Sequence, residues 1–527
     1  MPTYYDIHCH LFNKEILKPR LIDMLVPLLP LVDHRDLESQ KKVIKILKRL
    51  RRTLRIINKP VTGVFAHLDN AYGNDVVVTP LMFDLTYADD NESTRGQNLE
   101  YRIRQQMAEQ LIEYVTNKLQ AMSQNSVEMQ EALTWDDGTP LFDEVKERSR
   151  DVFDPNNYQE QIDSLEALAK DPANGGRVRP FFGVDPRRWR GREADLIAEV
   201  TQRCTGAGAL WAGVKLYAPA GFSPTDKLLY GPEASKNGGL YAFCEANAIP
   251  ITVHCSRSGF ACLSQEIIVD GHVNRKVGDL EEIVYYNHRN YRFVSKFFGL
   301  NPGPAGAIRE RARTLNHPKL WKLVLERFPN LKLNLAHWGN NIEIMAYIHR
   351  VLPEEFIKIK PVAFYDLLSL FNDVDKAKIK THYTLKGGLW QLNEANWPYE
   401  DDFKADLDKR TELWDLLAEK GQIDNWTKAI RDILEDPRFV NVRTDLSCFT
   451  EMDEDDPNDS IAKALTEFKT MLYDKLTPEV KKKVMYGSDF WLNVMQGPDM
   501  KQYFADFKTA FGAEFDDIAS VHPQAFL

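Results

Sequence analysis

Cysteine is scarce in this sequence, and long apolar segments are missing. Six cysteines are spread over 527 residues, and none belongs to a C-x-x-C pair. This usage is typical of a reduced, intracellular protein and argues against a disulfide framework. No apolar run approaches the roughly 18 residues that a membrane helix needs, and no basic segment followed by an apolar one opens the chain. We therefore expect a cytoplasmic protein with no membrane partner.

A surplus of positive charge is also missing. The formal net charge is −10, with 67 Lys and Arg against 77 Asp and Glu. Nucleic-acid-binding proteins normally carry a basic surplus or stripe, so nucleic acid is not expected as a partner. A basic segment does occur at residues 41–56. Against the acidic whole we interpret it as a helix with a solvated face rather than as a membrane or nucleic-acid helix.

Short apolar segments recur along the chain, each bounded by Gly, Pro or Asn, as is typical of strands buried on both faces. There are eight of them: Tyr4–His10, Asp75–Met82, Val178–Val184, Gly213–Tyr217, Ile249–His254, Leu331–His337, Phe439–Leu446 and Val484–Asp489. Helical patterns at Glu193–Arg203, Leu240–Ala248 and Lys319–Phe328 separate several of them. This alternation predicts an α/β fold, a (β/α)₈ TIM barrel that spans residues 1–527 as one domain. An open doubly wound sheet would carry a Gly-rich phosphate loop after its first strand, where this chain has His8-Cys9-His10.

Two connections are much longer than the rest, at about 90–175 and about 352–438. The first contains an amphipathic pattern near Tyr101–Met122 and an acidic, Asn-rich stretch near Asp151–Tyr158. Because long structureless loops are rare in compact domains, we expect mostly helical insertions. In a barrel they would lie over the C-terminal ends of the strands as a lid. Surface padding or a contact in a homo-oligomer explains them equally well.

Two histidines stand at the end of the first strand. Alternate residues of a strand point to the same side, so His8 and His10 would both project into the mouth of a barrel. Two imidazoles on one strand are a natural beginning of a Zn²⁺-type site. The pair alone is weak evidence, because two hydrogen-bonded surface histidines have the same spacing.

Three later strands end in residues of the same kind. His254 ends the fifth apolar segment, His337 the sixth and Asp489 the eighth. Singly, each histidine could be a hydrogen-bonded core residue, and Asp489 could cap the next helix. Together with the first-strand pair they would meet at one mouth, where the catalytic groups of barrels collect. The sequence therefore predicts a metal centre there.

At this point the sequence resembles a known family, the amidohydrolase superfamily, in its amidohydrolase-related branch of enzymes like aminocarboxymuconate-semialdehyde decarboxylase. The resemblance lies in DIHCH, RPFFGVDP, AGVKLY, IPITVHC, HPKLWKLVLERFPNLKLNLAHWG, NVRTDLS and VMYGSDF, in the order of that family's strands. It touches nearly every strand, but neither the second strand nor the long insertions. It implies a metal-dependent hydrolase or lyase.

The resemblance also implies roles for the strand-end residues. His8, His10, His254 and Asp489 resemble the ligands of one divalent metal, Zn²⁺ by expectation, with Mn²⁺ or Fe²⁺ as alternatives. His337 resembles the active-site histidine that faces the substrate or the water at the metal.

Lys215, in the fourth apolar segment, has two possible roles. In members of the family with two metals, a carbamylated lysine on this strand bridges the ions, and the second ion is bound by histidines at the His254 and His337 positions. Carbamylation needs a neutral amine and hence a pKa well below about 10.4. The other role, which we favour, is that of an ammonium that binds a substrate carboxylate.

We expect hydrolysis of an amide, lactone or similar bond in a small organic acid. Asp489 would take a proton from a metal-activated water, and His337 would polarise the scissile carbonyl. The alternative is non-oxidative decarboxylation of an unsaturated or aromatic carboxylic acid, and a remote one is a catalytically silent barrel used for binding. Arg257 and Trp338 are further candidates for binding an anionic small molecule, although a salt bridge and lid packing explain them equally well.

Overall fold

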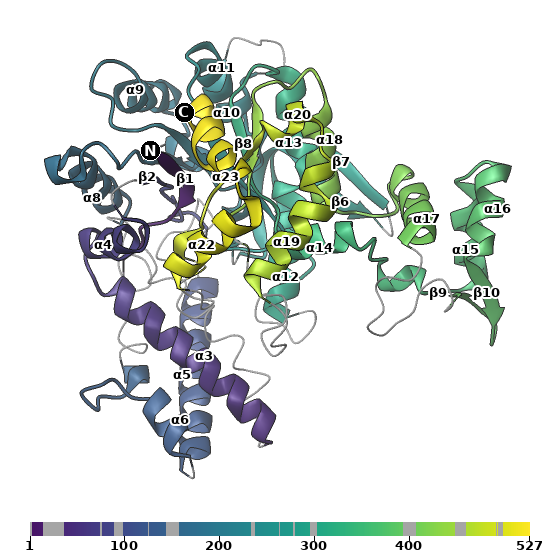
Figure 1. Cartoon of the computed structure of the whole chain (residues 1–527), viewed down its shortest axis with the longest axis horizontal. Helices are drawn as coiled ribbons and strands as arrows, with labels where there is room; N and C mark the ends of the chain where they lie inside the picture. Colours follow the sequence, from purple (N-terminus) through teal and green to yellow (C-terminus); the bar gives the residue numbers. More distant parts are fainter. Residues whose placement is uncertain are drawn as a thin grey trace.

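A six-stranded parallel sheet lies at the centre of the structure, a computed structural model (Figure 1). It describes residues 3–13, 36–73, 76–88, 99–124, 126–143, 157–232, 238–262, 264–277, 280–295, 303–393, 407–447, 449, 460–491, 493 and 499–527. The order of the strands is β13 (Val484–Met485), β12 (Val442–Asp445), β8 (Leu333–Gly339), β5 (Ile251–Ser256), β4 (Gly213–Leu216) and β3 (Phe181–Val184). The first two strands, β1 (Tyr4–Cys9) and β2 (Val76–Pro80), form a separate parallel pair.

Each of the eight apolar segments of the sequence overlaps one of these strands, so the predicted α/β fold is confirmed. Their residues are apolar because both faces of the sheet are covered. Every residue of β2, β3, β4, β5 and β8 is buried. Six of the eight strands are shorter than their apolar segments, and β13 has only two residues.

Backbone hydrogen bonds connect the β1–β2 pair with both edges of the six-stranded sheet. On one side, isolated parallel bridges join Val78 to Val178 and Leu81 to Phe181, next to β3. On the other side, Ile7 N donates to Tyr486 O at 3.2 Å and Asp489 N donates to His8 O at 2.7 Å, beyond the end of β13. The first strand of the chain therefore lies beside the last parallel strand.

Helices follow or precede the parallel strands and bury one side against them. They include α9 (Glu193–Cys204), α11 (Gly239–Ala246), α12 (Gly303–Asn316), α13 (Pro318–Arg327), α14 (Asn341–Ile348), α18 (Trp426–Glu435), α19 (Ile461–Met471) and α22 (Met500–Phe511). In α18 the buried Ile430, Ile433 and Leu434 recur with helical spacing, and each such side chain contributes about 1.5–3 kcal/mol by leaving water. The three helices predicted from the sequence between strands correspond to α9, α11 and α13, with ends that agree within two residues.

The first insertion region is helical, and part of it projects from one side of the sheet (Figure 1). It contains α5 (Leu99–Ser123), α6 (Val127–Ala132) and α8 (Asn157–Lys170), and α3 (Leu37–Ile57) packs against α6. The basic segment is α3, as predicted, and part of its charge is neutralised: Lys48 pairs with Glu128, and Arg51 and Arg55 pair with Asp136. Residues 151–156 of the acidic stretch lie outside the described residues.

The second insertion contains α15 (Pro361–Ser369), α16 (Asp373–Thr381) and α17 (Leu407–Glu419), and it extends away from the sheet (Figure 1). It also contains an antiparallel sheet that the sequence reading missed, made of β9 (Lys358–Ile359), β10 (Tyr383–Lys386) and β11 (Leu389–Leu392). The β10–β11 turn is Gly387-Gly388, with both φ angles positive, which is the usual signature of a tight hairpin.

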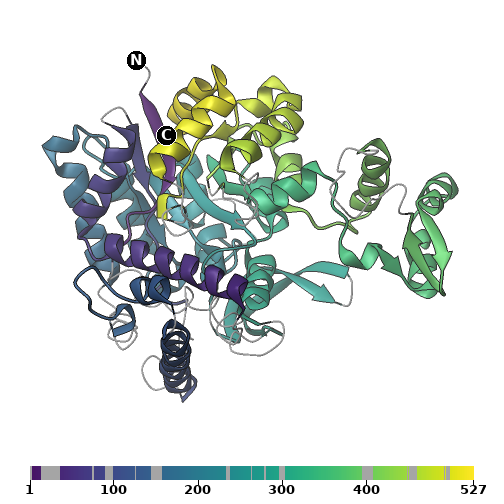
Figure 2. The same cartoon turned by 60° about the horizontal axis from the view of Figure 1, so that its bottom comes forward.

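A long hairpin between β5 and β8 was also missed. Its strands are β6 (Glu266–Val277) and β7 (Leu280–Arg292), and it reaches outward from the body of the molecule (Figure 2). Ile267, Val269 and Val273 alternate along one face of β6 and are buried. This alternation is the ordinary mark of a half-covered strand.

None of the helices described here combines the length and apolar character needed to cross a lipid bilayer. Five cysteines lie in the described part of the chain, and all five are free thiols, while Cys448 lies outside it.

Candidate metal centre

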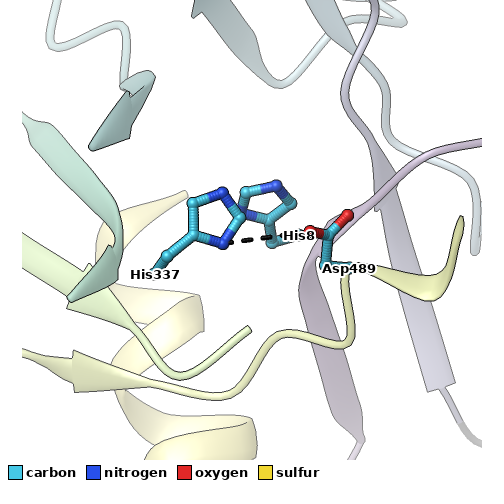
Figure 3. Close-up of side chains that lie close together, drawn as sticks. All are labelled: His8, His337 and Asp489. Atoms are coloured by element: carbon cyan, nitrogen blue, oxygen red, sulfur yellow. Dashed lines mark ion pairs between the residues drawn. The ribbon is translucent and has the colours of Figure 1, made fainter. Parts of the chain in front are cut away.

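Three of the predicted strand-end residues form one group. His8 lies in β1, His337 in β8 and Asp489 four residues after the end of β13, and all three are buried. One ligand atom from each lies within 4.8 Å of the others (Figure 3). Buried imidazole and carboxylate donors that converge from distant parts of the chain are positioned to hold a metal ion.

His8 in β1 and His10, directly after it, present acceptor nitrogens to one another. His10 Nδ1 lies 2.7 Å from the carbonyl oxygen of Leu81, and because a carbonyl only accepts, this nitrogen carries the ring proton. His8 Nδ1 lies 3.1 Å from Asp445 Oδ2 and donates to that carboxylate. The Nε2 atoms of both rings are then lone-pair acceptors, and they face each other at 3.3 Å. Facing lone pairs repel unless a cation lies between them, so this pair fits a bound metal.

Asp489 lies between His10 and His337. Its Oδ1 is 3.7 Å from His10 Nε2 and its Oδ2 is 3.9 Å from His337 Nδ1 (Figure 3). Both distances are too long for hydrogen bonds. Two ligands bound about 2.0–2.1 Å from one tetrahedral Zn²⁺ lie about 3.3 Å apart. The separations around Asp489 are close to that value, so the donor set fits a shared ion.

Burial sets the charge state of these groups. It is the largest cause that lowers the pKa of His10 and of His337 well below the ordinary value, so both rings are neutral at pH 7. It also raises the pKa of Asp489, while His8 and Lys215 oppose this shift. Neutral imidazoles and a carboxylate are the forms in which these side chains bind metals.

His254, predicted as a ligand, contacts His337 instead of Asp489. Its Nε2 lies 2.7 Å from the carbonyl oxygen of Ser258 and therefore carries the proton. Its Nδ1 is an acceptor and lies 3.0 Å from His337 Nε2. Burial, and then the charge of Lys215, lowers the pKa of His254 to about 3. Gly259 allows this arrangement, since a Cβ there would meet His254 Nε2 at 2.9 Å.

Sequence reasoning missed two residues, Asp445 and Ser447, at the end of β12. Ser447 Oγ lies 3.1 Å from His8 Nδ1 and 2.8 Å from His337 Nδ1, and it also contacts the Asp445 carboxylate. Although burial opposes ionisation of Asp445, the neighbouring His8 and His337 hold its pKa well below the usual range. The sequence did carry a signal, because NVRTDLS places an aspartate at the end of an apolar segment, as VMYGSDF does.

The backbone is strained at two of the site residues. His337 has φ 69° and Asp489 has φ 44°, both in the left-handed region that side chains other than glycine rarely adopt. Asp489 is held there by its N–H bond to His8 O, and the preceding Ser488 N donates to the buried Asp6 carboxylate at 2.9 Å. Non-glycine residues held in this conformation cluster at functional sites.

Lys215, in β4, is a buried cation beside aromatic rings. Its Nζ is 5.7 Å from the ring centre of Phe83 and 6.0 Å from that of Tyr217, and it has no hydrogen-bond partner among the described residues. Burial lowers the pKa of Lys215 to about 7, partly offset by the carboxylates of Asp445 and Asp489. A buried ammonium without an acceptor is costly, so this position is suited to an anionic ligand.

The aromatic surroundings extend along one side of the centre. Phe12 stacks on the ring of His10 with centroids 4.7 Å apart, and Phe83 lies 4.3 Å from the same ring. Tyr217 contacts Phe83 on one side and His254 on the other, at 4.5 and 4.7 Å. These rings keep water away from the histidines and leave Lys215 as the cation beside them.

Arg257 and Trp338 are engaged elsewhere. Arg257 pairs with Asp424 and, at 3.3 Å, with Glu343. Trp338 is buried, and its Nε1 donates to Thr427 O in α18 at 3.2 Å. The structure therefore places Arg257 in ion pairs and Trp338 in packing under the second insertion.

Asp424 belongs to a further cluster with Glu281 and His317. His317 Nδ1 accepts from Lys319 N at 3.0 Å, so its Nε2 carries the proton and donates to Asp424 at 2.7 Å. A nitrogen that carries a proton offers no lone pair, and Arg257 and Lys319 already neutralise the carboxylates. The cluster is suited to joining the hairpin and the second insertion to the start of α13 rather than to binding a metal.

Substituting Arg257 by alanine is expected to loosen the second insertion without affecting the metal centre. The loss of its hydrogen bonds to charged groups should lower the free energy of unfolding by about 1–3 kcal/mol. We expect a lower melting temperature and faster proteolysis within residues 352–425, with unchanged metal affinity. Arg438→Ala, which removes an exposed arginine paired with Asp436, is the control. A raised KM for an anionic substrate, with proteolysis unchanged, would instead return Arg257 to the substrate site.

Comparisons with family models, curated proteins and solved structures found no match to this chain. The relationship suggested by the sequence motifs is therefore a proposal.

Proposed function

We propose that this chain is a metal-dependent hydrolase of the amidohydrolase type, acting on an amide, lactone or similar bond of a small anionic molecule. One observation carries the proposal: the Nε2 lone pairs of His8 and His10 face each other at 3.3 Å, with Asp489 Oδ1 3.7 Å from His10 Nε2. A proton shared by the two histidines would give no hydrogen bond to the Asp489 carboxylate, which lies 3.7 Å from His10 Nε2. A divalent cation, Zn²⁺ by preference, accounts for all three.

We further propose that the eight parallel strands form a closed barrel. Hydrogen bonds that join β1 to the segment after β13, and bridges that join β2 to the β3 region, support this closure. His8, His337 and Asp489 would then occupy the carboxyl ends of barrel strands, where catalytic groups of this architecture lie.

His8, His10 and Asp489 would hold the cation. His337 Nδ1 is directed to Asp489, whereas His254 Nδ1 already faces the other nitrogen of His337. This arrangement favours His337 as the next ligand, although the family resemblance assigns that place to His254. The cation would supply Lewis acidity, which makes water a nucleophile near neutral pH.

Side chains of the protein would transfer the proton and bind the substrate. Asp489 would take the proton of the attacking water and pass it to the leaving group, since burial makes its carboxylate a stronger base. The Lys215 ammonium would bind the substrate carboxylate, and Phe83 and Tyr217 would cover the flat part of the substrate. We therefore expect an organic acid with a planar or unsaturated portion.

Substituting Lys215 by methionine is expected to raise KM for the anionic substrate about 10- to 100-fold, the equivalent of one charge-assisted hydrogen bond. In the parent, KM should rise as the pH increases through about 7, because Lys215 then loses the proton that makes it a cation. In the variant this dependence should disappear. A neutral ester of the same acid is the control substrate, and equal KM changes for acid and ester would contradict the role.

Metal analysis and a substrate panel test the proposal. Protein expressed with added Zn²⁺, Mn²⁺ or Fe²⁺ should retain about one ion per chain after gel filtration, and chelation should abolish activity. Two ions per chain would assign Lys215 to a carbamylated bridge. The panel contains lactones, amides and unsaturated or aromatic carboxylates, with detection of both hydrolysis products and CO₂. CO₂ without hydrolysis products would assign the site to decarboxylation, and the absence of any retained metal would refute the proposal.

A further inference from the structure

Asp445 is a buried carboxylate that accepts hydrogen bonds on both oxygens. Oδ2 accepts from His8 Nδ1 at 3.1 Å and from Asn334 Nδ2 at 2.7 Å. Oδ1 accepts from the backbone N–H of His337 at 3.0 Å and of Ser447 at 3.2 Å. One side chain thus contacts the histidine of β1 and the backbone of the histidine in β8.

The contact with His8 decides which nitrogen of that ring can bind a metal. A neutral imidazole has one nitrogen with a proton and one with a lone pair. A carboxylate can only accept, so it keeps the proton of His8 on Nδ1 and leaves the lone pair on Nε2, the atom that faces His10. Without this partner the proton could occupy either nitrogen.

The contact with His337 concerns the backbone. His337 has φ 69°, a conformation that is unfavourable for a residue with a β carbon. The hydrogen bond from its N–H to Asp445 Oδ1 stabilises this turn, after which the ring points to Asp489. The same carboxylate therefore acts on two donors of the candidate centre.

We infer that Asp445 is a positioning residue of the metal centre, which sets the tautomer of His8 and holds the backbone turn at His337. This inference rests on the proposed function, because it takes His8 to be a metal ligand. Asp445 acts through these two residues rather than on the substrate.

The variant Asp445→Asn replaces one of the two carboxylate oxygens by an amide nitrogen and keeps the other oxygen. On the Oδ1 side the new amide nitrogen would meet two backbone N–H groups, so it is confined to the Oδ2 side. There Asn334 can accommodate it, because Asn334 Oδ1 has no hydrogen-bond partner in the described part of the chain and its amide can turn to accept. His8 Nδ1 would then face a donor, which moves the ring proton to Nε2 and removes the ligand lone pair.

The test is a Zn²⁺ titration of metal-free protein against a chromophoric chelator. We expect Asp445→Asn to bind Zn²⁺ about 10- to 100-fold more weakly than the parent, as is typical when the partner of a ligand histidine is lost. Ser447→Ala removes the hydroxyl that also touches His8 but keeps the carboxylate, so its affinity should change by no more than a few-fold. Asp226→Asn, a buried helix cap away from the centre, controls for the loss of a buried carboxylate.

The outcomes distinguish this inference from the proposed function. A parent that binds no Zn²⁺ refutes the proposed function. A parent that binds, with equal affinity in Asp445→Asn or equal weakening in Ser447→Ala, overturns the role of Asp445 alone. Should Asp445→Asn not fold, ¹⁵N spectra of histidine-labelled, metal-free parent give a second readout, with His8 assigned by its loss in His8→Gln. A proton found on Nε2 of His8 would overturn the inference.

Discussion

Substituting His10 by alanine is expected to weaken metal binding by more than 100-fold, beyond the range found for partners of ligand residues. The variant loses one of the two facing Nε2 atoms. His8 Nε2 then has no second imidazole beside it with which to share a metal ion. The ring of His10 also stacks on Phe12, so a modest loss of stability accompanies the loss of metal. Metal content after gel filtration and a Zn²⁺ titration measure the effect.

The matched control is His349→Ala, which removes a half-buried histidine paired with Glu467 outside the centre. It should retain the metal content of the parent. If His10→Ala retained a full equivalent of metal with parental affinity, the pair of His8 and His10 would not be part of the site. The two histidines would then be a hydrogen-bonded pair, the alternative that the H-x-H spacing leaves open.

Substituting Asp489 by asparagine is expected to lower kcat/KM by about 10²- to 10⁴-fold, the usual contribution of a proton-transferring group. An amide cannot accept the proton of the attacking water. The fold should be unaffected, because asparagine adopts the left-handed conformation at φ 44° at least as readily as aspartate. Initial rates on the substrate found in the panel, with metal content measured in the same samples, test this expectation.

Metal content separates two ways in which Asp489→Asn could fail. If the variant keeps its metal but not its activity, the proton-transfer role is supported, and if it loses both, Asp489 is mainly a ligand. Asp499→Asn is the control, because Asp499 caps α22 and asparagine caps a helix equally well. Near-parental activity in Asp489→Asn would contradict both roles.

The residues of the candidate centre could be predicted because buried parallel strands have a simple sequence pattern. A strand buried on both faces is a short apolar segment, and the polar residue at its carboxyl end marks the place where side chains reach the site. His8, His337 and Asp489 were found in this way, and the structure brings them together. The rule identifies strand ends without ranking them, and so it could not decide that His254 contacts His337 instead of Asp489.

The features that were not predicted depend on contacts with residues far away in the sequence, and not on a local sequence pattern. Asp445 stands at a strand end like the others, but its importance comes from the donors around it, which belong to β1, β8 and Ser447. Arg257 was a candidate for substrate because the charge of Asp424, far along the chain, was not known to face it. The β6–β7 hairpin has a regular alternation. It does not fit the predicted pattern of parallel strands and helices, because it is an antiparallel pair inserted between β5 and β8.

The hydrogen bonds between β1 and the segment after β13 join residues 482 positions apart, as between Ser488 and Asp6. A ribosome that adds about 5–20 residues per second needs roughly 25–100 s to make the intervening chain. His8 and His10 therefore emerge long before their carboxylate partner Asp489. On the proposed function, metal binding by the full ligand set therefore waits until residue 489 has left the ribosome. A mutation that weakens the contacts of β1 should reduce the yield of loaded protein in the cell before it changes the turnover of the molecules that have matured.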